Sequence, residues 1–214
     1  MTPEQAEHRE FLDRYYSAAR PIYDLTRKYY LFGRDRALAR LLADPWDSLV
    51  EVGPGTGRNL RIIHRQRPSA RLGGVQPPAP MLPHAARRCP WATFHRGFAE
   101  DVDYTAVLGE PPQRILFSYC LSMVRHREVA IERALAGLAP GGELHIVAFA
   151  DLAGLPAALR EGLRRWLAAF RVEPLDPGSL AASNAELVLG PGRYYVLARL
   201  RADSRLPGRR LPAA

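Results

Sequence analysis

The chain has 214 residues, of which 47% are hydrophobic and 24% are charged, so it is long enough to bury the core of one globular domain. Its formal net charge of +8 comes almost wholly from arginine, since Lys28 is the only lysine. No stretch approaches the roughly 20 apolar residues of a membrane span, and residues 1–10 lack a signal-peptide core, so we expect a cytoplasmic protein.

The first part of the chain predicts helices. Residues 3–42 have helical composition, with one break near Arg20-Pro21 and another near Gly33. Tyrosines are concentrated here (Tyr15, Tyr16, Tyr23, Tyr29 and Tyr30). They form either an aromatic helix-packing face or part of a binding site. We expect residues 1–42 to form a helical cap on the domain that follows.

The middle of the chain alternates apolar strands with helices. We expect strands at residues 49–52, 71–75, 93–95, 114–119 and 143–149. Helices are expected at residues 58–66, 81–88 and 129–138, and a proline-rich turn at residues 77–80. Strands that alternate with helices predict a parallel, doubly wound α/β sheet.

The last part of the chain predicts a helix and a hairpin. Residues 156–170 have apolar side chains at helical spacing, which favours a helix covering the core, with a helix lying against lipid as the alternative. Residues 187–189 and 194–200 predict two strands joined by a turn at residues 190–192, which would add antiparallel strands at one edge of the sheet. We therefore expect the main domain at residues 43–200 and a basic tail at residues 201–214.

The most informative segment is the turn after the first strand. Glu51 ends the strand, and Gly53, Gly55 and Gly57 follow at alternate positions before the next helix. Each glycine lets the backbone turn tightly and approach a ligand, and the helix presents free N–H groups to it. The spacing G-x-G-x-G lacks the third glycine of the dinucleotide fingerprint and the Lys-Ser/Thr of a P-loop. From the residues alone, three alternatives remain for this segment: a structural turn, a nucleotide site or a site for another cofactor.

This segment resembles motif I of the class I S-adenosylmethionine-dependent methyltransferases, in the form E-x-G-x-G-T-G. The resemblance implies a Rossmann-like fold with S-adenosylmethionine bound across the carboxyl ends of strands one, two and four, and S-adenosylhomocysteine as the product. The cofactor-binding residues it implies are Tyr23, Arg27, Glu51, Gly53, Gly55, Thr56, Gly57, Asn59, Gln76, Met81, Phe98, Ala99, Ser118 and Tyr119. Among them, Asn59 is expected to cap the helix, and Ser118 and Tyr119 to face the reacting methyl group.

Three further segments resemble the bacterial betaine-lipid N-methyltransferases. They are residues 22–36 (I-Y-D-L-T-R-K-Y-Y-L-F-G-R-D-R), 118–123 (S-Y-C-L-S-M) and 148–156 (A-F-A-D-L-A-G-L-P). The resemblance implies three methyl transfers to the amine of diacylglyceryl-homoserine, a lipid substrate at the membrane surface and contact with anionic lipid on the inner membrane face. Tyr119, Tyr23, Tyr30 and His126 are the catalytic candidates, as groups that take or relay the amine proton or hold the ammonium by cation–π contact. For His126 the alternative is a solvated residue at a helix start.

The chain departs from the methyltransferase pattern at three positions. Gln76 replaces the carboxylate that usually follows strand two, Phe98 stands in Gly97-Phe98-Ala99 where an aspartate is typical, and Gln113 replaces the acid that opens strand four. A glutamine loses the charge-assisted bond, which is worth about 1–2 kcal/mol. Either the cofactor is bound in a rearranged way, or the chain kept the fold and lost the reaction.

The charge and the cysteines add weaker indications. Cys89 and Cys120 lie far apart and have no zinc-ligand spacing, which argues against a disulfide framework and gives no metal site. The arginine surplus suits lipid headgroups, a nucleic acid or simply a solvated basic surface. No nucleic-acid motif is recognisable, so we expect no nucleic-acid partner. A small-molecule or nucleic-acid methyltransferase, or a non-enzymatic protein that docks on anionic surfaces, remains the alternative.

Overall fold

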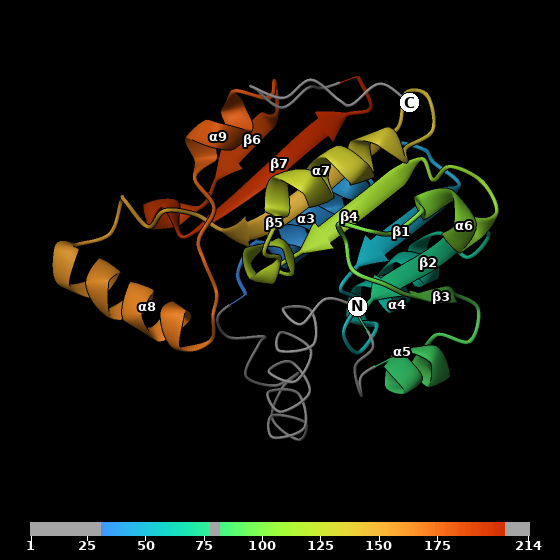
Figure 1. Cartoon of the computed structure of the whole chain (residues 1–214), viewed down its shortest axis with the longest axis horizontal. Helices are drawn as coiled ribbons and strands as arrows, with labels where there is room; N and C mark the ends of the chain where they lie inside the picture. Colours follow the sequence, from blue (N-terminus) through green and yellow to red (C-terminus); the bar gives the residue numbers. More distant parts are fainter. Residues whose placement is uncertain (1–30, 78–81, 204–214) are drawn as a thin grey trace.

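The computed structural model describes residues 31–77 and 82–203, and these residues form a seven-stranded sheet (Figure 1). The strand order is β3-β2-β1-β4-β5-β7-β6. β7 is antiparallel to both of its neighbours, whereas the strands from β3 to β5 pair in parallel. The strands are β1 (Ser48–Val52), β2 (Arg71–Gln76), β3 (Thr93–Arg96), β4 (Arg114–Ser118), β5 (Glu143–Phe149), β6 (Glu186–Leu189) and β7 (Tyr195–Arg201).

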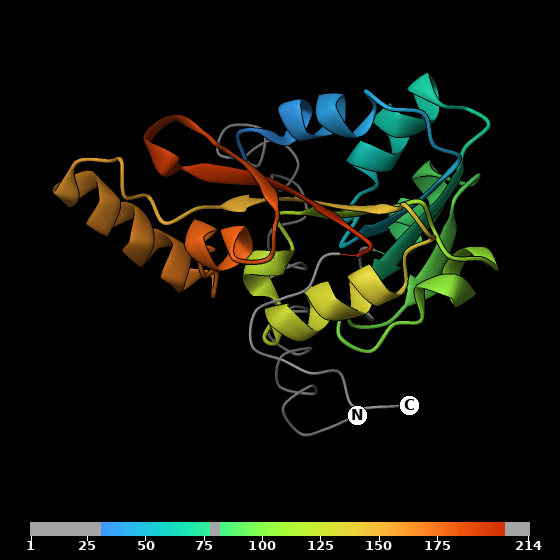
Figure 2. The same ribbon diagram turned by 90° about the horizontal axis from the view of Figure 1, so that it is seen from above.

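Helices cover both faces of this sheet because its central strands are apolar on both sides (Figure 2). On one face, α3 (Arg34–Leu41), α4 (Arg58–Gln66) and Cys89, just after α5 (Leu82–Arg88), pack on a cluster that includes Leu49 and Leu116. On the other face, residues of α6 (Tyr104–Leu108), α7 (Arg127–Ala136) and α9 (Pro177–Ala181) pack against Val50, Ile115 and Ile146. The expected α/β architecture, with its C-terminal antiparallel strands, is confirmed.

Several boundaries differ from the sequence prediction. The predicted bounds of α4 and β5 agree with the structure, but β4 ends at Ser118, because Tyr119 has a left-handed φ of 59°. α7 begins at Arg127 rather than at residue 129. The short helices α6 and α9 were not predicted, although each begins after an aspartate whose side chain caps it, Asp103 and Asp176. The helices expected before residue 31, most of the proline-rich turn and the tail from residue 204 lie outside the described residues.

The helix expected to cover the core does so only at Leu167 and Leu163. α8 (Ala157–Ala169) buries only Leu167, and the rest of the helix projects from the side of the sheet (Figures 1 and 2). The prediction followed the helical spacing of its apolar residues, which shows that one face is apolar but not what that face contacts. Within the described residues, no helix is long and apolar enough to cross a membrane.

A buried charge network lies at the amino end of β4 and β5. The Glu143 carboxylate is 3.3 Å from the Arg114 guanidinium, 3.1 Å from His145 Nε2 and 3.5 Å from Arg199. The hydrogen bond from His145, together with the charges of Arg114 and Arg199, lowers the pKa of Glu143 to about 2 despite its burial. Because the acid and its partners are all largely shielded from water, Glu143 is the group on which this cluster depends.

We expect Glu143→Gln to lower the free energy of unfolding by about 3 kcal/mol at pH 7, because it leaves Arg114 buried without its counter-charge. A lowered pKa means that the stabilisation is complete above about pH 5 and is lost as the pH falls towards 2. Urea denaturation at pH 7 and pH 3 should therefore show a gap between wild type and variant that narrows in acid. Glu186→Gln, which removes an exposed partner of Arg199, should cause a smaller loss. A stability difference between wild type and Glu143→Gln that is the same at pH 7 and pH 3 would contradict this role of Glu143.

Candidate functional site

The glycine turn between β1 and α4 is held by the two cysteines. Gly53 and Gly57 have left-handed φ angles of 68° and 78°. A Cβ at Gly53 would lie 2.6 Å from the Cβ of Cys120, and a Cβ at Gly57 would lie 2.7 Å from the Cys89 sulfur. Gly55 is different, because a Cβ there would meet nothing within 4 Å. The backbone is thus tightly packed at both ends of the turn and open at its centre, where a ligand has room to approach.

Glu51 lies beneath this turn and is 1% exposed. One carboxylate oxygen accepts a hydrogen bond of 2.7 Å from the Asn59 amide, and the Leu60 N–H in the first turn of α4 also interacts with the carboxylate, although the second oxygen has no partner of normal hydrogen-bond geometry within the described residues. Burial raises the pKa of Glu51 to about 7, although Asn59 and the charges of Arg34 and Arg58 lower it. An acid poised at neutral pH, with an unsatisfied oxygen, is suited to meet a positively charged group of a ligand.

The expected capping role of Asn59 is wrong. The N-cap of α4 is Gly57, which has no side chain to cap with, and Asn59 lies inside the first turn. Its amide donates to Glu51 instead, while its oxygen accepts from Arg58. The first N–H groups of α4 therefore receive no side-chain cap from Gly57, as expected of a helix start that binds an anion.

The two glutamines that replace typical acids lie at opposite ends of the sheet. Gln76 ends β2, is 4% exposed, and its side-chain oxygen accepts a 3.1 Å hydrogen bond from the Gly55 N–H. Gln113 precedes β4, and its side-chain oxygen accepts a 2.8 Å bond from the N–H of Asp47, just before β1. Gln113 is thus at the amino end of the strands and has no place at the glycine turn, so its substitution does not weaken a site there. Gln76 does belong to the site, as a brace of its turn.

The predicted adenine-binding segment lies beside the end of β2. The Gly97 N–H donates to the Gln76 carbonyl at 3.1 Å, which ties the two loops together. Phe98 is half-buried, and its carbonyl accepts from the N–H groups of Asp101 and Val102. Ala99 is buried in the core. The structure thus brings this segment next to the glycine turn, while the contact with adenine stays a prediction.

Tyr119 follows β4 and is largely enclosed. Its hydroxyl donates to the carbonyl of Phe32, and its ring meets the Phe149 ring edge-on, with centroids 4.8 Å apart. Burial raises the pKa of the Tyr119 hydroxyl, so the phenol is held neutral. The hydroxyl therefore fastens the start of the described chain to the carboxyl end of β4, and a role in proton transfer stays a prediction.

The remaining predicted residues divide into three groups. Thr56 in the turn and Ser118 at the end of β4 are half-buried near Gly53–Gly57. His126 is exposed at the start of α7, as the solvated-residue alternative requires. Tyr23, Arg27, Tyr30 and Met81 lie outside the described residues.

The role of the two cysteines was missed by sequence reasoning. Their only signal is position, since Cys120 closely follows a strand end.

A family model described as a methyltransferase domain matches residues 23–175, which is most of the chain and includes the whole glycine turn. The chain belongs to the class I S-adenosylmethionine-dependent methyltransferase family. The expected fold and the expected cofactor, S-adenosylmethionine, are thereby confirmed. The betaine-lipid subfamily is not shown by these comparisons.

The domain is similar to curated trans-aconitate 2-methyltransferases. That of Paracidovorax citrulli is 33% identical over 109 residues, 51% of this chain and 41% of the relative. That of Variovorax paradoxus is 29% identical over 164 residues, 75% of this chain and 59% of the relative. The chain thus spans between two fifths and three fifths of the length of these relatives.

Solved structures share the fold at low identity. The Haemonchus contortus phosphoethanolamine N-methyltransferase 2 structure gives a TM-score of 0.67 at 17% identity, over 85% of this chain and 46% of that one. A Thermotoga maritima methyltransferase, described as a possible histamine N-methyltransferase, gives 0.65 at 18% identity, over 90% and 98%. These likenesses support the methyltransferase fold.

The residues of the turn fit S-adenosylmethionine. Its methionine part carries an ammonium and a carboxylate, and we expect the Glu51 carboxylate to meet the first and the start of α4, whose N-cap Gly57 has no side chain, to meet the second. The open space at Gly55 lets the backbone come close to the ligand.

We expect Gln76→Ala to weaken S-adenosylmethionine binding about five- to tenfold, because the Gly55 N–H loses its acceptor and the turn loses its brace. Isothermal titration calorimetry measures the change. Gln113→Ala is the matched control, since it removes a similar bond at the other end of the sheet and should leave the affinity unchanged. Equal effects of the two substitutions would show that Gln76 acts only through stability.

Glu51→Gln should separate stability from binding. A raised pKa means that the ionised carboxylate destabilises the fold increasingly between pH 4.5 and 7, so the variant should be more stable than wild type at pH 8, by up to about 3 kcal/mol, and similar near pH 4.5. S-adenosylmethionine should bind wild type more tightly at pH 8 than at pH 6, because ionised Glu51 attracts its positive charge. The variant should lose that pH dependence.

Glu143→Gln is the control for Glu51→Gln, since both glutamates are buried but their pKa values are shifted in opposite directions. It should destabilise the domain at pH 8 and leave the pH dependence of cofactor binding intact. Thermal unfolding and calorimetry on the three proteins give both readouts. A flat pH profile in wild type would remove Glu51 from the cofactor site.

Proposed function

We propose that this chain methylates the amine nitrogen of a homoserine-type lipid headgroup with S-adenosylmethionine as methyl donor. The observation that carries the transferase part is the glycine turn with buried Glu51 beneath it, in a domain of the methyltransferase family. The acceptor rests on the resemblance of residues 22–36, 118–123 and 148–156 to betaine-lipid N-methyltransferases.

The described residues have distinct parts in such a reaction. The start of α4 and the turn amides hold the methionine carboxylate, and Gln76 sets the turn beside the ribose. When bound, S-adenosylmethionine supplies an electrophilic methyl group on its sulfonium. The protein's main contribution is to hold the nitrogen in line with that carbon, which favours displacement by removing unproductive orientations.

Arg34 supplies a positive charge at the same place. It begins α3, and its guanidinium lowers the pKa of both Glu51 and Tyr119, so its field reaches the carboxyl ends of β1 and β4. A homoserine headgroup carries a carboxylate beside its amine, and an arginine is well suited to bind it. We place the headgroup carboxylate on this side of the cofactor, near Arg34.

Methylation of a small polycarboxylate is the second candidate. The sequence identity of 29–33% to trans-aconitate 2-methyltransferases favours it, and an arginine near the site would bind such an acceptor equally well. The two candidates differ in the atom that receives the methyl group, an amine nitrogen or a carboxylate oxygen.

An assay with radiolabelled S-adenosylmethionine should distinguish them, with diacylglyceryl-homoserine in mixed micelles and trans-aconitate as separate acceptors. We expect label in the lipid, in products that carry up to three methyl groups by mass spectrometry. A methyl ester of trans-aconitate would replace the lipid proposal. If calorimetry shows cofactor binding but neither acceptor is labelled, the acceptor is a different one. If no cofactor binds at millimolar concentration, the chain has kept the fold and lost the reaction.

A further inference from the structure

α8 is the most weakly packed long helix in the part of the chain that the structure describes. Only Leu167 of its 13 residues is buried, and both ribbon views show the helix standing away from the sheet. A helix of this length is marginal in water without packing on an apolar partner. Its position therefore calls for a second surface to lie against.

One face of α8 is apolar and partly exposed. Leu163 packs against the core cluster around Leu167 and Phe170 is half-buried, while Leu159 and Trp166 are exposed. Leu159, Leu163, Trp166 and Phe170 are four, three and four residues apart, which places them on a single stripe along the helix. Leu159 is 53% exposed and Trp166 is 39% exposed, although these are among the most hydrophobic side chains of the protein. The Trp166 and Phe170 rings meet edge-on with centroids 5.1 Å apart, so the aromatic end of the stripe is preformed.

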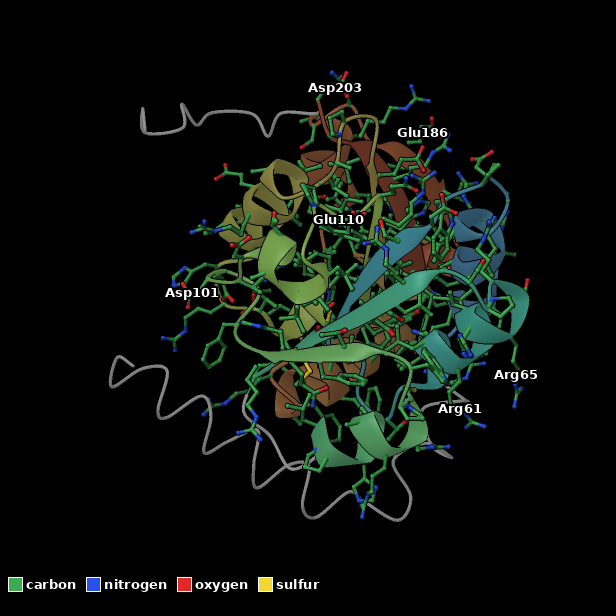
Figure 3. All side chains as sticks on the ribbon, turned by 90° about the vertical axis from the view of Figure 1, so that its right-hand side faces the viewer. Arg61, Arg65, Asp101, Glu110, Glu186 and Asp203 are labelled. Carbon is green, nitrogen blue, oxygen red and sulfur yellow. The ribbon has the colours of Figure 1, made fainter. Side chains whose placement is uncertain are left out.

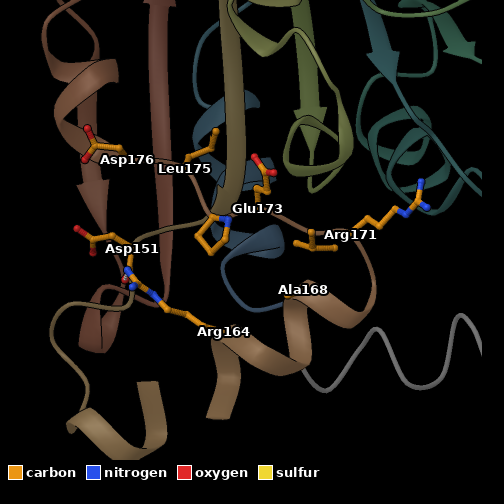
Figure 4. Close-up of a pocket in the computed structure, with 9 residues that line it drawn as sticks. Asp151, Arg164, Ala168, Arg171, Glu173, Leu175 and Asp176 are labelled. Carbon is orange, nitrogen blue, oxygen red and sulfur yellow. Dashed lines mark hydrogen bonds between the residues drawn. The ribbon is translucent and has the colours of Figure 1, made fainter. Parts of the chain in front are cut away.

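The charges beside this stripe are mostly positive. α8 carries Arg160, Arg164 and Arg165 against the single acid Glu161, which pairs with Arg165 at 2.8 Å. Arg171 follows directly after the helix. A hollow of about 620 Å³ separates the end of the helix from the segment that returns to the sheet. Figure 4 shows Arg164 beside Asp151, whereas Arg171 points away from Asp151. The Arg164 guanidinium donates to the Asp151 carbonyl at 3.2 Å, which ties the middle of α8 to the loop after β5.

We propose that α8 docks on an anionic lipid bilayer, with Leu159 and Trp166 in the interface and its arginines on the headgroups. An apolar stripe beside arginines is the pattern of a helix that lies in the plane of a membrane, because the apolar side chains enter the acyl boundary and long basic side chains reach the phosphates. Tryptophan prefers that boundary, since its ring is apolar and its N–H is polar. At about 20 Å the helix is too short to span a bilayer.

Docking by α8 would bring the candidate site close to lipid. α8 follows β5, and β5 is parallel to β4 and β1, so the helix starts from the edge of the sheet that carries the glycine turn. A bilayer against α8 would thus face the carboxyl ends of the strands, where a headgroup has the shortest path to the cofactor. This purpose rests on the proposed lipid acceptor, whereas the docking itself does not require methyl transfer.

The chain contains its own probe for this contact. Of its three tryptophans, Trp46 is buried and Trp91 half-buried, and Trp166 lies on the stripe. Vesicles of phosphatidylcholine with phosphatidylglycerol should shift the tryptophan emission to the blue, and brominated acyl chains should quench it. Pure phosphatidylcholine vesicles should give a much weaker effect at the same ionic strength. Trp166→Phe should retain binding in a sedimentation assay and lose most of the spectral change.

Two double variants test the two parts of the surface. Arg160→Gln with Arg165→Gln should weaken binding about fivefold for each arginine removed. Leu159→Gln with Trp166→Gln should weaken it at least tenfold. Arg61→Gln with Arg65→Gln on α4 is the matched control, because it removes the same charge from side chains that point outward on another face (Figure 3). This control should have little effect on vesicle binding. All of these side chains are exposed or half-buried, and far-UV circular dichroism verifies the fold.

Several outcomes would overturn the proposal. One is that the protein does not bind anionic vesicles, another is that the α4 control loses as much vesicle binding as the α8 variants, and a third is that both α8 variants bind vesicles as tightly as wild type. A concentration-dependent dimer that the α8 variants abolish would make a second copy of the chain, not lipid, the partner of α8. Binding is measured without S-adenosylmethionine, so the two proposals fail separately. If lipid in micelles is methylated but vesicles are not bound, only the docking proposal is contradicted. If α8 binds vesicles but no lipid is methylated, only the proposed acceptor is contradicted.

Discussion

The contact between the glycine turn and the two cysteines is the constraint on which the candidate site depends. Cys120 is placed by the end of β4 and Cys89 by the end of α5, and each occupies the space where a side chain at Gly53 or Gly57 would lie. The Cys120 thiol donates to the Val52 carbonyl at 2.9 Å, at the last residue of β1. The turn is therefore fixed by neighbours on both sides, and only its centre at Gly55 stays open. A ligand meets a preformed backbone, which reduces the entropy lost on binding.

The sequence predicts the fold well because the sheet is built from signals that are local. β5 is mostly apolar and follows the Gly141-Gly142 turn, and α4 follows a glycine turn, so their bounds can be recognised without knowledge of their neighbours. The glycine turn itself is predicted for the same reason. The short helices α6 and α9 escape prediction because five residues are too few to show a period, although their aspartate caps are visible.

The parts that could not be predicted are those that depend on distant partners. Gln76 and Gln113 are the same residue type at opposite ends of their strands, and one braces the glycine turn while the other accepts from Asp47 at the far end of the sheet. The sequence shows that Gln76 follows a strand and Gln113 precedes one, but the partners of their side chains follow only from the register of β1 with β2 and β4. The packing of α8 could not be predicted for the same reason. The spacing of its apolar residues specifies an apolar face but not whether that face contacts the core.

Two buried glutamates, one at each end of the sheet, differ in how far their neighbours compensate for the loss of water. Glu143 is surrounded by Arg114, His145 and Arg199, and their hydrogen bond and charges hold its pKa near 2. Glu51 is more deeply buried, and although the Asn59 amide and the Leu60 backbone N–H lower its pKa, burial holds that pKa near 7. Burial without full compensation destabilises a fold, and such groups are retained where a ligand completes the set of partners. The deficit lies at the carboxyl ends of the parallel strands, directly below an open glycine turn and beside the start of a helix. A cationic ligand bound there would neutralise Glu51 while the helix start receives its anion, so the zwitterionic methionine part of the cofactor would suit both groups together.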